Sequence, residues 1–266
     1  MKTPCFILAA LMLAVPCAEA EPQPIEVHDR VVTGTDPGKK IALTLDACGG
    51  KYDEDLINFL IKNKIPATIF ATKKWLTRNP QGLAVIKAHL DLFDVEDHGE
   101  KHIPAIIGKD RTVYGIPGEP DVVHLRREVV EGARAIEKAT GVAPHWYRGA
   151  TGEYDPQAIR EIDKLGYKIA GFSVNADSGA TLKKLTIEKR LKQVKAGDVI
   201  IAHMNKPESD SAEGLAVGLA YLVKEGFVFV RLDQVDLKEI PEKSGKESAK
   251  PEKHPQPASA PQAVPH

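Results

Sequence analysis

Seven short apolar runs recur along the middle of the chain and alternate with stretches of a different pattern. They occupy residues 41–45, 67–71, 92–95, 145–148, 168–172, 199–202 and 227–231. Continuous apolar runs of this length are typical of strands that are buried on both faces of a parallel sheet. The pattern therefore predicts seven such strands.

The stretches between the runs carry apolar residues at intervals of three and four. Leu56, Phe59 and Leu60 show this spacing, and a longer stripe extends from Val122 to Ile136. This spacing puts apolar side chains on one face of a helix. Helices often end just before a glycine, and four glycines stand ahead of predicted strands: Gly141, Gly166, Gly197 and Gly226. Alternating strands and helices predict an α/β protein with either a parallel barrel or a doubly wound sheet.

The first twenty residues have the pattern of a secretory signal peptide. Lys2 supplies a positive charge, residues 6–15 are apolar, and Ala18 and Ala20 are the small residues that precede a cleavage site. The apolar run is too short for a stable membrane anchor. We expect cleavage near Ala20, a periplasmic or secreted protein and no transmembrane anchor afterwards. A lipoprotein signal at Cys17 is the alternative, which Pro16 disfavours.

The other end of the chain also differs from the middle. Residues 241–266 are rich in proline, lysine, serine and alanine and show no apolar periodicity. Such a segment cannot bury enough apolar surface to offset the entropy of ordering it, so we expect a disordered tail and a folded domain over residues 21–240. Across the chain, 36 Lys and Arg residues nearly balance 37 Asp and Glu residues, which gives no indication of a nucleic-acid partner.

Ionisable residues stand where the predicted strands end. They are Asp46, His98, His102, Arg148, Asp177 and His203. The carboxyl ends of the strands in a parallel barrel share one face, and active sites are built on that face. Residues that are far apart in the sequence are therefore expected to converge.

His98 and His102 have a spacing that suits a metal site. On a helical turn, residues i and i+4 point the same way, so two imidazoles could bind one metal ion. Gly99 stands where the glutamate of the metalloprotease H-E-x-x-H motif would be, so that motif is absent. Two imidazoles and a carboxylate are a common ligand set for catalytic zinc, which leaves a position for water.

Each of the other residues has both a structural and a chemical interpretation. Asp46 could cap a turn or act as a base or metal ligand, and His203 could be a hydrogen-bonded core residue or a general acid. Arg148 could form a salt bridge in the barrel, and Asp177 could cap a turn. Their combination at one face favours a hydrolytic site.

Five short motifs, in order, resemble those of the polysaccharide deacetylase family with the NodB-type domain. They are TLD at 44–46, DHGEKH at 97–102, RGATG at 148–152, the less similar FSVNAD at 172–177 and IAH at 201–203. The resemblance extends over about residues 40–232. It implies a distorted seven-stranded (β/α) barrel and a metal-dependent hydrolase that removes N-acetyl groups from a glycan.

The resemblance also implies a role for each motif residue. Asp46 would be the general base, with Arg148 orienting it. His98 and His102 would hold a divalent metal, with zinc as the expected ion. His203 would protonate the leaving amine, with Asp177 tuning it. The backbone N–H near Thr151 would help to stabilise the oxyanion.

The first motif departs from the family pattern at one position. The family has two adjacent aspartates there, a base followed by a metal ligand, and this chain has Ala47 in the second position. The third ligand could then be Asp46 or water, with Cys48 as a less favoured candidate. Two other functions stay open, a catalytically silent, metal-free carbohydrate-binding barrel and an amidohydrolase that acts on a small non-sugar amide.

Overall fold

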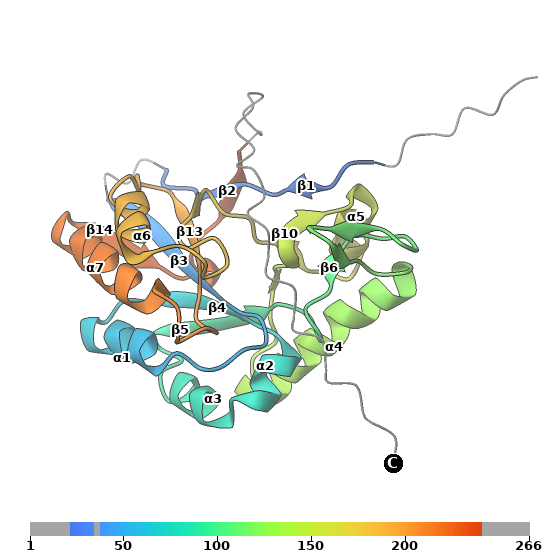
Figure 1. The fold of residues 1–266 in the computed structure, drawn as a ribbon, viewed down its shortest axis with the longest axis horizontal. Helices are drawn as coiled ribbons and strands as arrows, with labels where there is room; N and C mark the ends of the chain where they lie inside the picture. Colours follow the sequence, from blue (N-terminus) through green and yellow to red (C-terminus); the bar gives the residue numbers. More distant parts are fainter. Residues whose placement is uncertain (1–21, 35–37, 241–266) are drawn as a thin grey trace, which may run out of the picture.

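The computed structural model describes residues 22–34 and 38–240, so the predicted signal peptide and tail lie outside the described residues. Its centre is a parallel sheet in the order β11-β9-β5-β4-β3-β13-β12, and β14 also pairs with β3 (Figure 1). The strands of this sheet are β3 (Lys39–Ala47), β4 (Ala67–Ala71), β5 (Phe93–Asp97), β9 (Trp146–Tyr147), β11 (Lys168–Ile169), β12 (Val174–Asn175), β13 (Val199–His203) and β14 (Phe227–Val230).

The two edge strands of the sheet follow one another in the chain. Only residues 170–173 connect β11 with β12, so the sheet must curl until its edges come near each other. The result is an incomplete barrel, which confirms the distorted barrel predicted from the motifs. The sequence pattern merged β11 and its connection into one run at 168–172 and did not predict β12, because β12 is only two residues long.

Helices surround the sheet in the alternating order that the sequence predicts. They are α1 (Glu54–Asn63), α2 (Lys73–Arg78), α3 (Pro80–Lys87), α4 (Val122–Thr140), α5 (Pro156–Lys164), α6 (Lys184–Leu191) and α7 (Ser211–Lys224), followed by the short 3₁₀ helix η1 (Leu232–Gln234). The Asp121 side chain caps the start of α4, and Gly141 ends it with a φ of 82°. Glycine adopts this left-handed conformation without strain, as expected for the residue after a helix.

In the described part of the chain, three smaller sheets lie outside the barrel sheet. Strand β10 (Ala150–Tyr154) pairs with β1 (Ile25–Glu26) and β6 (Pro104–Ala105). The others pair β2 (Asp29–Val31) with β15 (Leu237–Glu239) and β7 (Thr112–Val113) with β8 (Ile116–Pro117). Within residues 22–34 and 38–240, every helix is too short or too polar to cross a lipid bilayer.

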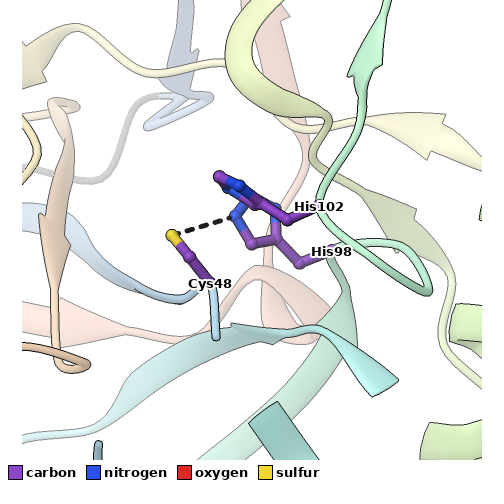
Figure 2. Close-up of side chains that lie close together, drawn as sticks. All are labelled: Cys48, His98 and His102. Carbon is purple, nitrogen blue, oxygen red and sulfur yellow. Dashed lines mark hydrogen bonds between the residues drawn. The ribbon is translucent and has the colours of Figure 1, made fainter. Parts of the chain in front are cut away.

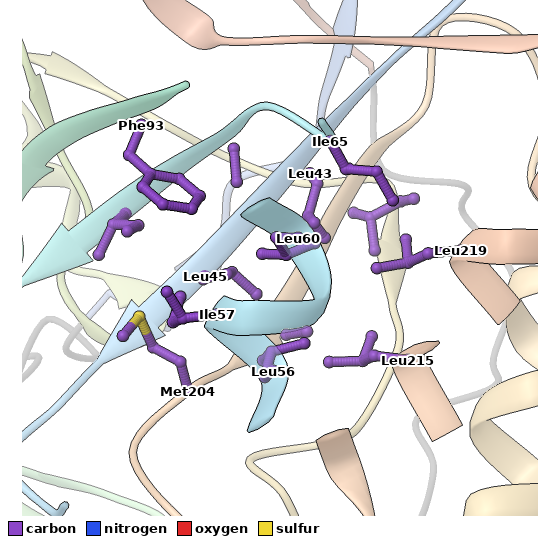
Figure 3. Close-up of a cluster of buried hydrophobic side chains, with 14 of the residues drawn as sticks. Leu43, Leu45, Leu56, Ile57, Leu60, Ile65, Phe93, Met204, Leu215 and Leu219 are labelled. Carbon is purple, nitrogen blue, oxygen red and sulfur yellow. The ribbon is translucent and has the colours of Figure 1, made fainter. Parts of the chain in front are cut away.

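The two faces of the barrel sheet bury different sets of side chains. The larger apolar cluster lies between the sheet and its helices, and it includes Leu43 and Leu45 of β3, Leu60 of α1 and Leu219 of α7 (Figure 3). Ala42 of the same strand packs in a separate cluster. Successive side chains of a strand point to opposite faces, so β3 directs its odd-numbered residues towards the helices and its even-numbered residues towards the barrel interior.

Candidate active site

Arg148 and Asp46 form a buried ion pair inside the barrel. Arg148 Nη1 donates to Asp46 Oδ1 at 2.9 Å and to Thr44 Oγ1 at 2.7 Å. Its Nε donates to the carbonyl of Ala170 at 3.1 Å, and its guanidinium lies 4.2 Å from the centre of the Phe70 ring. Arg148 is only 1% exposed. A guanidinium held on several sides fixes the orientation of the carboxylate that it contacts.

His98 follows β5 and is oriented by a backbone carbonyl. Its Nδ1 lies 2.5 Å from the carbonyl oxygen of Arg148. A carbonyl can only accept, so Nδ1 carries a proton, and in the neutral form of the ring the lone pair is on Nε2. That Nε2 atom lies 3.7 Å from Asp46 Oδ2 and 3.5 Å from Cys48 Sγ. An imidazole arranged in this way is prepared to bind a metal through Nε2.

The His102 side chain lies next to His98 but comes from a loop. The prediction of a helical turn for the H-x-x-x-H spacing is therefore wrong. Residues 98–102 are not helical, and His102 has a φ of 70°. Glu128 on α4 holds this loop: its Oε1 accepts from the backbone N–H groups of Lys101, His102 and Ile103 at 2.8, 2.8 and 3.2 Å. The two imidazole rings nevertheless meet, with centroids 4.7 Å apart.

Cys48 completes a cluster of three possible metal ligands. One ligand atom each from Cys48, His98 and His102 lies within 4.8 Å of the others, and Figure 2 shows the thiol facing the two rings. The hydroxyl of Thr72 donates to the carbonyl oxygen of Cys48 at 2.7 Å, which holds this part of the backbone. Thiolate and imidazole are the donors that zinc prefers in proteins, so these residues fit the predicted metal.

The charges around this cluster favour a bound cation. Burial would lower the pKa of His98, but the charge of Asp46 and the contact with Cys48 raise it to about 9. Burial would raise the pKa of the Cys48 thiol, but the nearby His102 and the hydrogen bonds to the surrounding histidines lower it well below its usual range. The thiolate is the form that binds metals.

His203 and Asp177 form a second carboxylate–histidine pair beside the first. In the register between β13 and β3, His203 lies opposite Asp46. Its Nδ1 lies 2.8 Å from Asp177 Oδ1, while Asp177 Oδ2 accepts from the His203 backbone N–H and from Ser211 Oγ, each at 2.9 Å. Burial would lower the pKa of His203, but the charge and hydrogen bond of Asp177 raise it well above its usual value.

A cavity of about 460 Å³ opens beside the cluster. Cys48 and His102 contribute to its wall, together with four lysines: Lys51, Lys74, Lys101 and Lys206. Cavities of a few hundred cubic ångströms accommodate small-molecule ligands. Cys48 and His102 are therefore accessible from a space of suitable size.

Thr151 is the predicted site residue whose position says least about its role. Its backbone has a φ of 72°, and its Oγ1 is buried without a hydrogen-bond partner in the described part of the chain. It follows Arg148 by three residues in the same motif. The contribution of its N–H to oxyanion stabilisation stays a prediction.

Two contacts around the site were not predicted from the sequence. Glu128 organises the loop of His102, and Ser211 supports Asp177. Glu128 interrupts the apolar stripe of α4 and is 2% exposed beside buried Leu125 and Val129. A charged residue within an apolar helical stripe is a signal that could have identified it, since buried charges need partners. Ser211, at the start of α7, carries no such signal.

Known proteins with a similar sequence or fold identify the family and agree with the barrel architecture. The family model for polysaccharide deacetylases matches residues 33–170, just over half of the chain. No curated protein matches the sequence. Wild-type BA3943, a CE4 family pseudoenzyme from Bacillus anthracis, is 18% identical with a TM-score of 0.60, over 82% of this chain and 69% of its own.

Two other solved structures show the same fold. PdaA from Bacillus subtilis, a family 4 carbohydrate esterase, is 20% identical with a TM-score of 0.61, over 79% of this chain and 84% of its own. The Bc1960 peptidoglycan N-acetylglucosamine deacetylase is 19% identical with a TM-score of 0.62, over 76% of this chain and 89% of its own. The family match, the barrel and the order of the motifs agree, and the chain belongs to the polysaccharide deacetylase family.

Proposed function

We propose that the protein is a metal-dependent hydrolase that removes N-acetyl groups from a polysaccharide or oligosaccharide. The observation that carries this proposal is the placement of Asp46 and His203 opposite each other on adjacent strands, beside the histidine pair. Hydrolysis of an amide needs a base for the attacking water and an acid for the departing amine. Asp46 is our proposed base and His203 our proposed acid, and both lie beside the candidate metal site.

His98 and His102 would hold the metal, for which zinc is our proposed ion. A bound divalent cation lowers the pKa of water and polarises the acetyl carbonyl. Asp46 takes the proton from the attacking water, and Arg148 keeps the carboxylate aimed at that position through its bond to Oδ1. Oδ2 lies on the side of His98 and is the oxygen that we propose as the proton acceptor.

His203 gives a proton to the amine nitrogen as the C–N bond breaks and acetate forms. Its Nδ1 is engaged by Asp177, so Nε2 is the nitrogen that remains for the substrate. Asp177 stabilises the protonated imidazole, since its charge favours the cationic form. The backbone N–H of Thr151 is our proposed additional donor to the oxyanion. The N-terminal sequence supports a periplasmic or secreted location for this reaction.

The experiment is an acetate-release assay on N-acetylated glycan oligomers and on small non-sugar amides, with metal-loaded and chelated protein. We expect acetate from the glycans with the loaded protein, and a large loss after chelation. Release from small amides alone would indicate an amidohydrolase of a different substrate class. Binding of glycans without acetate release under any metal would indicate a catalytically silent carbohydrate-binding barrel.

A further inference from the structure

The end of strand β3 offers a ligand one residue beyond the position at which the motif lacks a carboxylate. Thr44 and Asp46 face the barrel interior, where both contact Arg148. Leu45 and Ala47 face the helices and belong to the large apolar cluster. Because side chains alternate along a strand, the next residue on the face of Asp46 is Cys48.

Ala47 is poorly placed for any polar replacement. It is fully buried, packs in the same cluster as Ala71 and Trp75, and pairs with Ala71 in the register between β3 and β4. A carboxylate at this position would start from the apolar side of the sheet, where an unpaired charge is costly.

Asp46 is also poorly placed to be the third ligand, because its orientation is set by other partners. One carboxylate oxygen is bound by Arg148 at 2.9 Å. The other lies 3.7 Å from His98 Nε2, farther than Cys48 Sγ at 3.5 Å. A base that also bound the metal through this oxygen would have less freedom to accept a proton.

We propose that Cys48 is the third protein ligand of the metal, together with His98 and His102, and that Asp46 is left free as the base. The three donors come from two loops whose backbones are held by Thr72 and Glu128. Zinc binds sulfur at about 2.3 Å and nitrogen at about 2.0 Å, so one ion can reach two donors that are 3.5 Å apart.

A thiolate changes the chemistry of the site compared with a carboxylate. It adds the same negative charge but is a softer donor, which favours zinc and cobalt over magnesium, calcium and manganese. Three protein ligands leave one position of a tetrahedral ion for water, as in catalytic zinc sites. This inference deepens the proposed function, but it can be tested on the bound metal without any turnover.

The test is the electronic spectrum of the full-length protein loaded with Co²⁺. We expect wild type to show an intense thiolate-to-cobalt charge-transfer band in the near ultraviolet, and Cys48→Ser to lose it. Metal affinity of Cys48→Ser, measured by competition with a chelator of known affinity, should fall by more than about 100-fold, beyond the usual cost of removing an outer-shell partner. His203→Ala is the matched control, because it alters the same site without removing a proposed ligand, and should keep the band.

Two carboxylate variants test whether position 47 or position 48 can supply the third ligand. Cys48→Asp should bind metal without the charge-transfer band, while Ala47→Asp in the Cys48→Ser background should not restore binding. A missing band in metal-loaded wild type, or a band that persists in Cys48→Ser, would overturn the proposal. Acetate release by a wild-type protein that lacks the band would leave the deacetylase function standing while removing Cys48 from the metal site.

Discussion

The two carboxylate–histidine pairs of the site use the same residue types in different arrangements. Asp177 touches His203 directly at 2.8 Å, whereas Asp46 Oδ2 lies 3.7 Å from His98 Nε2. His98 is oriented instead by the carbonyl of Arg148. Either partner on Nδ1 leaves Nε2 available, but a carboxylate in direct contact also adds a charge that favours the protonated imidazole of an acid, whereas a carbonyl adds no such charge. The hydrogen-bond partner of each histidine therefore indicates its proposed role.

The largest expected effect comes from removing a histidine of the first pair. His98→Ala and His102→Ala should each abolish tight metal binding and reduce acetate release to the level of the chelated protein, because each removes a proposed ligand. Metal content after purification and metal titration measure this effect. His124→Ala removes an exposed imidazole on α4 and should bind metal as wild type does. Stoichiometric metal in a His98→Ala, His102→Ala double variant would contradict the site.

Replacing the carboxylate of the first pair should leave the metal in place but remove the base. We expect Asp46→Asn to lower kcat by about 10⁴-fold, the upper end of the range for one acid–base group. The control is Asp163→Asn, which changes an exposed aspartate of α5. Turnover of Asp46→Asn near the wild-type value, with an unchanged circular dichroism spectrum, would show that another group is the base.

Removing the imidazole of the second pair should cost about 10²–10⁴-fold in kcat. A general acid must be protonated to act, so His203 is expected to set the alkaline limb of the pH–rate profile. His203→Ala should lose that limb while keeping its metal, in contrast to His98→Ala. A profile that kept both limbs in this variant would argue against His203 as the acid.

Removing the negative charge of Asp177 should have a smaller effect on the rate and should shift the pH–rate profile in a defined direction. Asp177 raises the pKa of His203, so Asp177→Asn should lower that pKa and move the alkaline limb to lower pH. We expect kcat at the optimum to fall by less than about 100-fold, because the acid itself is still present. A limb that stayed in place would show that Asp177 does not tune the acid.

The smallest effect is expected from changing Glu128, which holds the loop that carries His102. Glu128→Gln keeps an acceptor for the loop of His102 but loses the negative charge, so metal affinity should fall by about tenfold, the lower end for outer-shell changes. Chelator competition measures this change. The alkaline limb assigned to His203 should not move, and an equal effect on both pairs would point to a general loss of stability.

The sequence pattern predicted alternating strands and helices with ionisable residues at the strand ends, and the resemblance of the motifs implied the barrel. Apolar periodicity is a local property, so β3, β4, β5 and α4 could be found from spacing and from the glycine that follows the helix. The rule that parallel strands end at one face then located Asp46, His98, Arg148 and His203 near each other. Strand β12 was not predicted, because a strand of two residues is too short to show a periodic pattern.

Which atoms meet at that face depends on how distant parts of the chain pack together. The spacing of His98 and His102 suggested a helical turn, but the rings converge because Glu128, from a distant helix, holds the loop that carries His102. From the sequence, Cys48 was a less favoured ligand candidate than Asp46. In the structure, Cys48 lies on the same side of the chain as Asp46, and the carbonyl of Arg148 orients His98 so that its Nε2 lies near the Cys48 sulfur. Such contacts depend on how loops and strand ends pack, and residue spacing along the chain does not specify that packing.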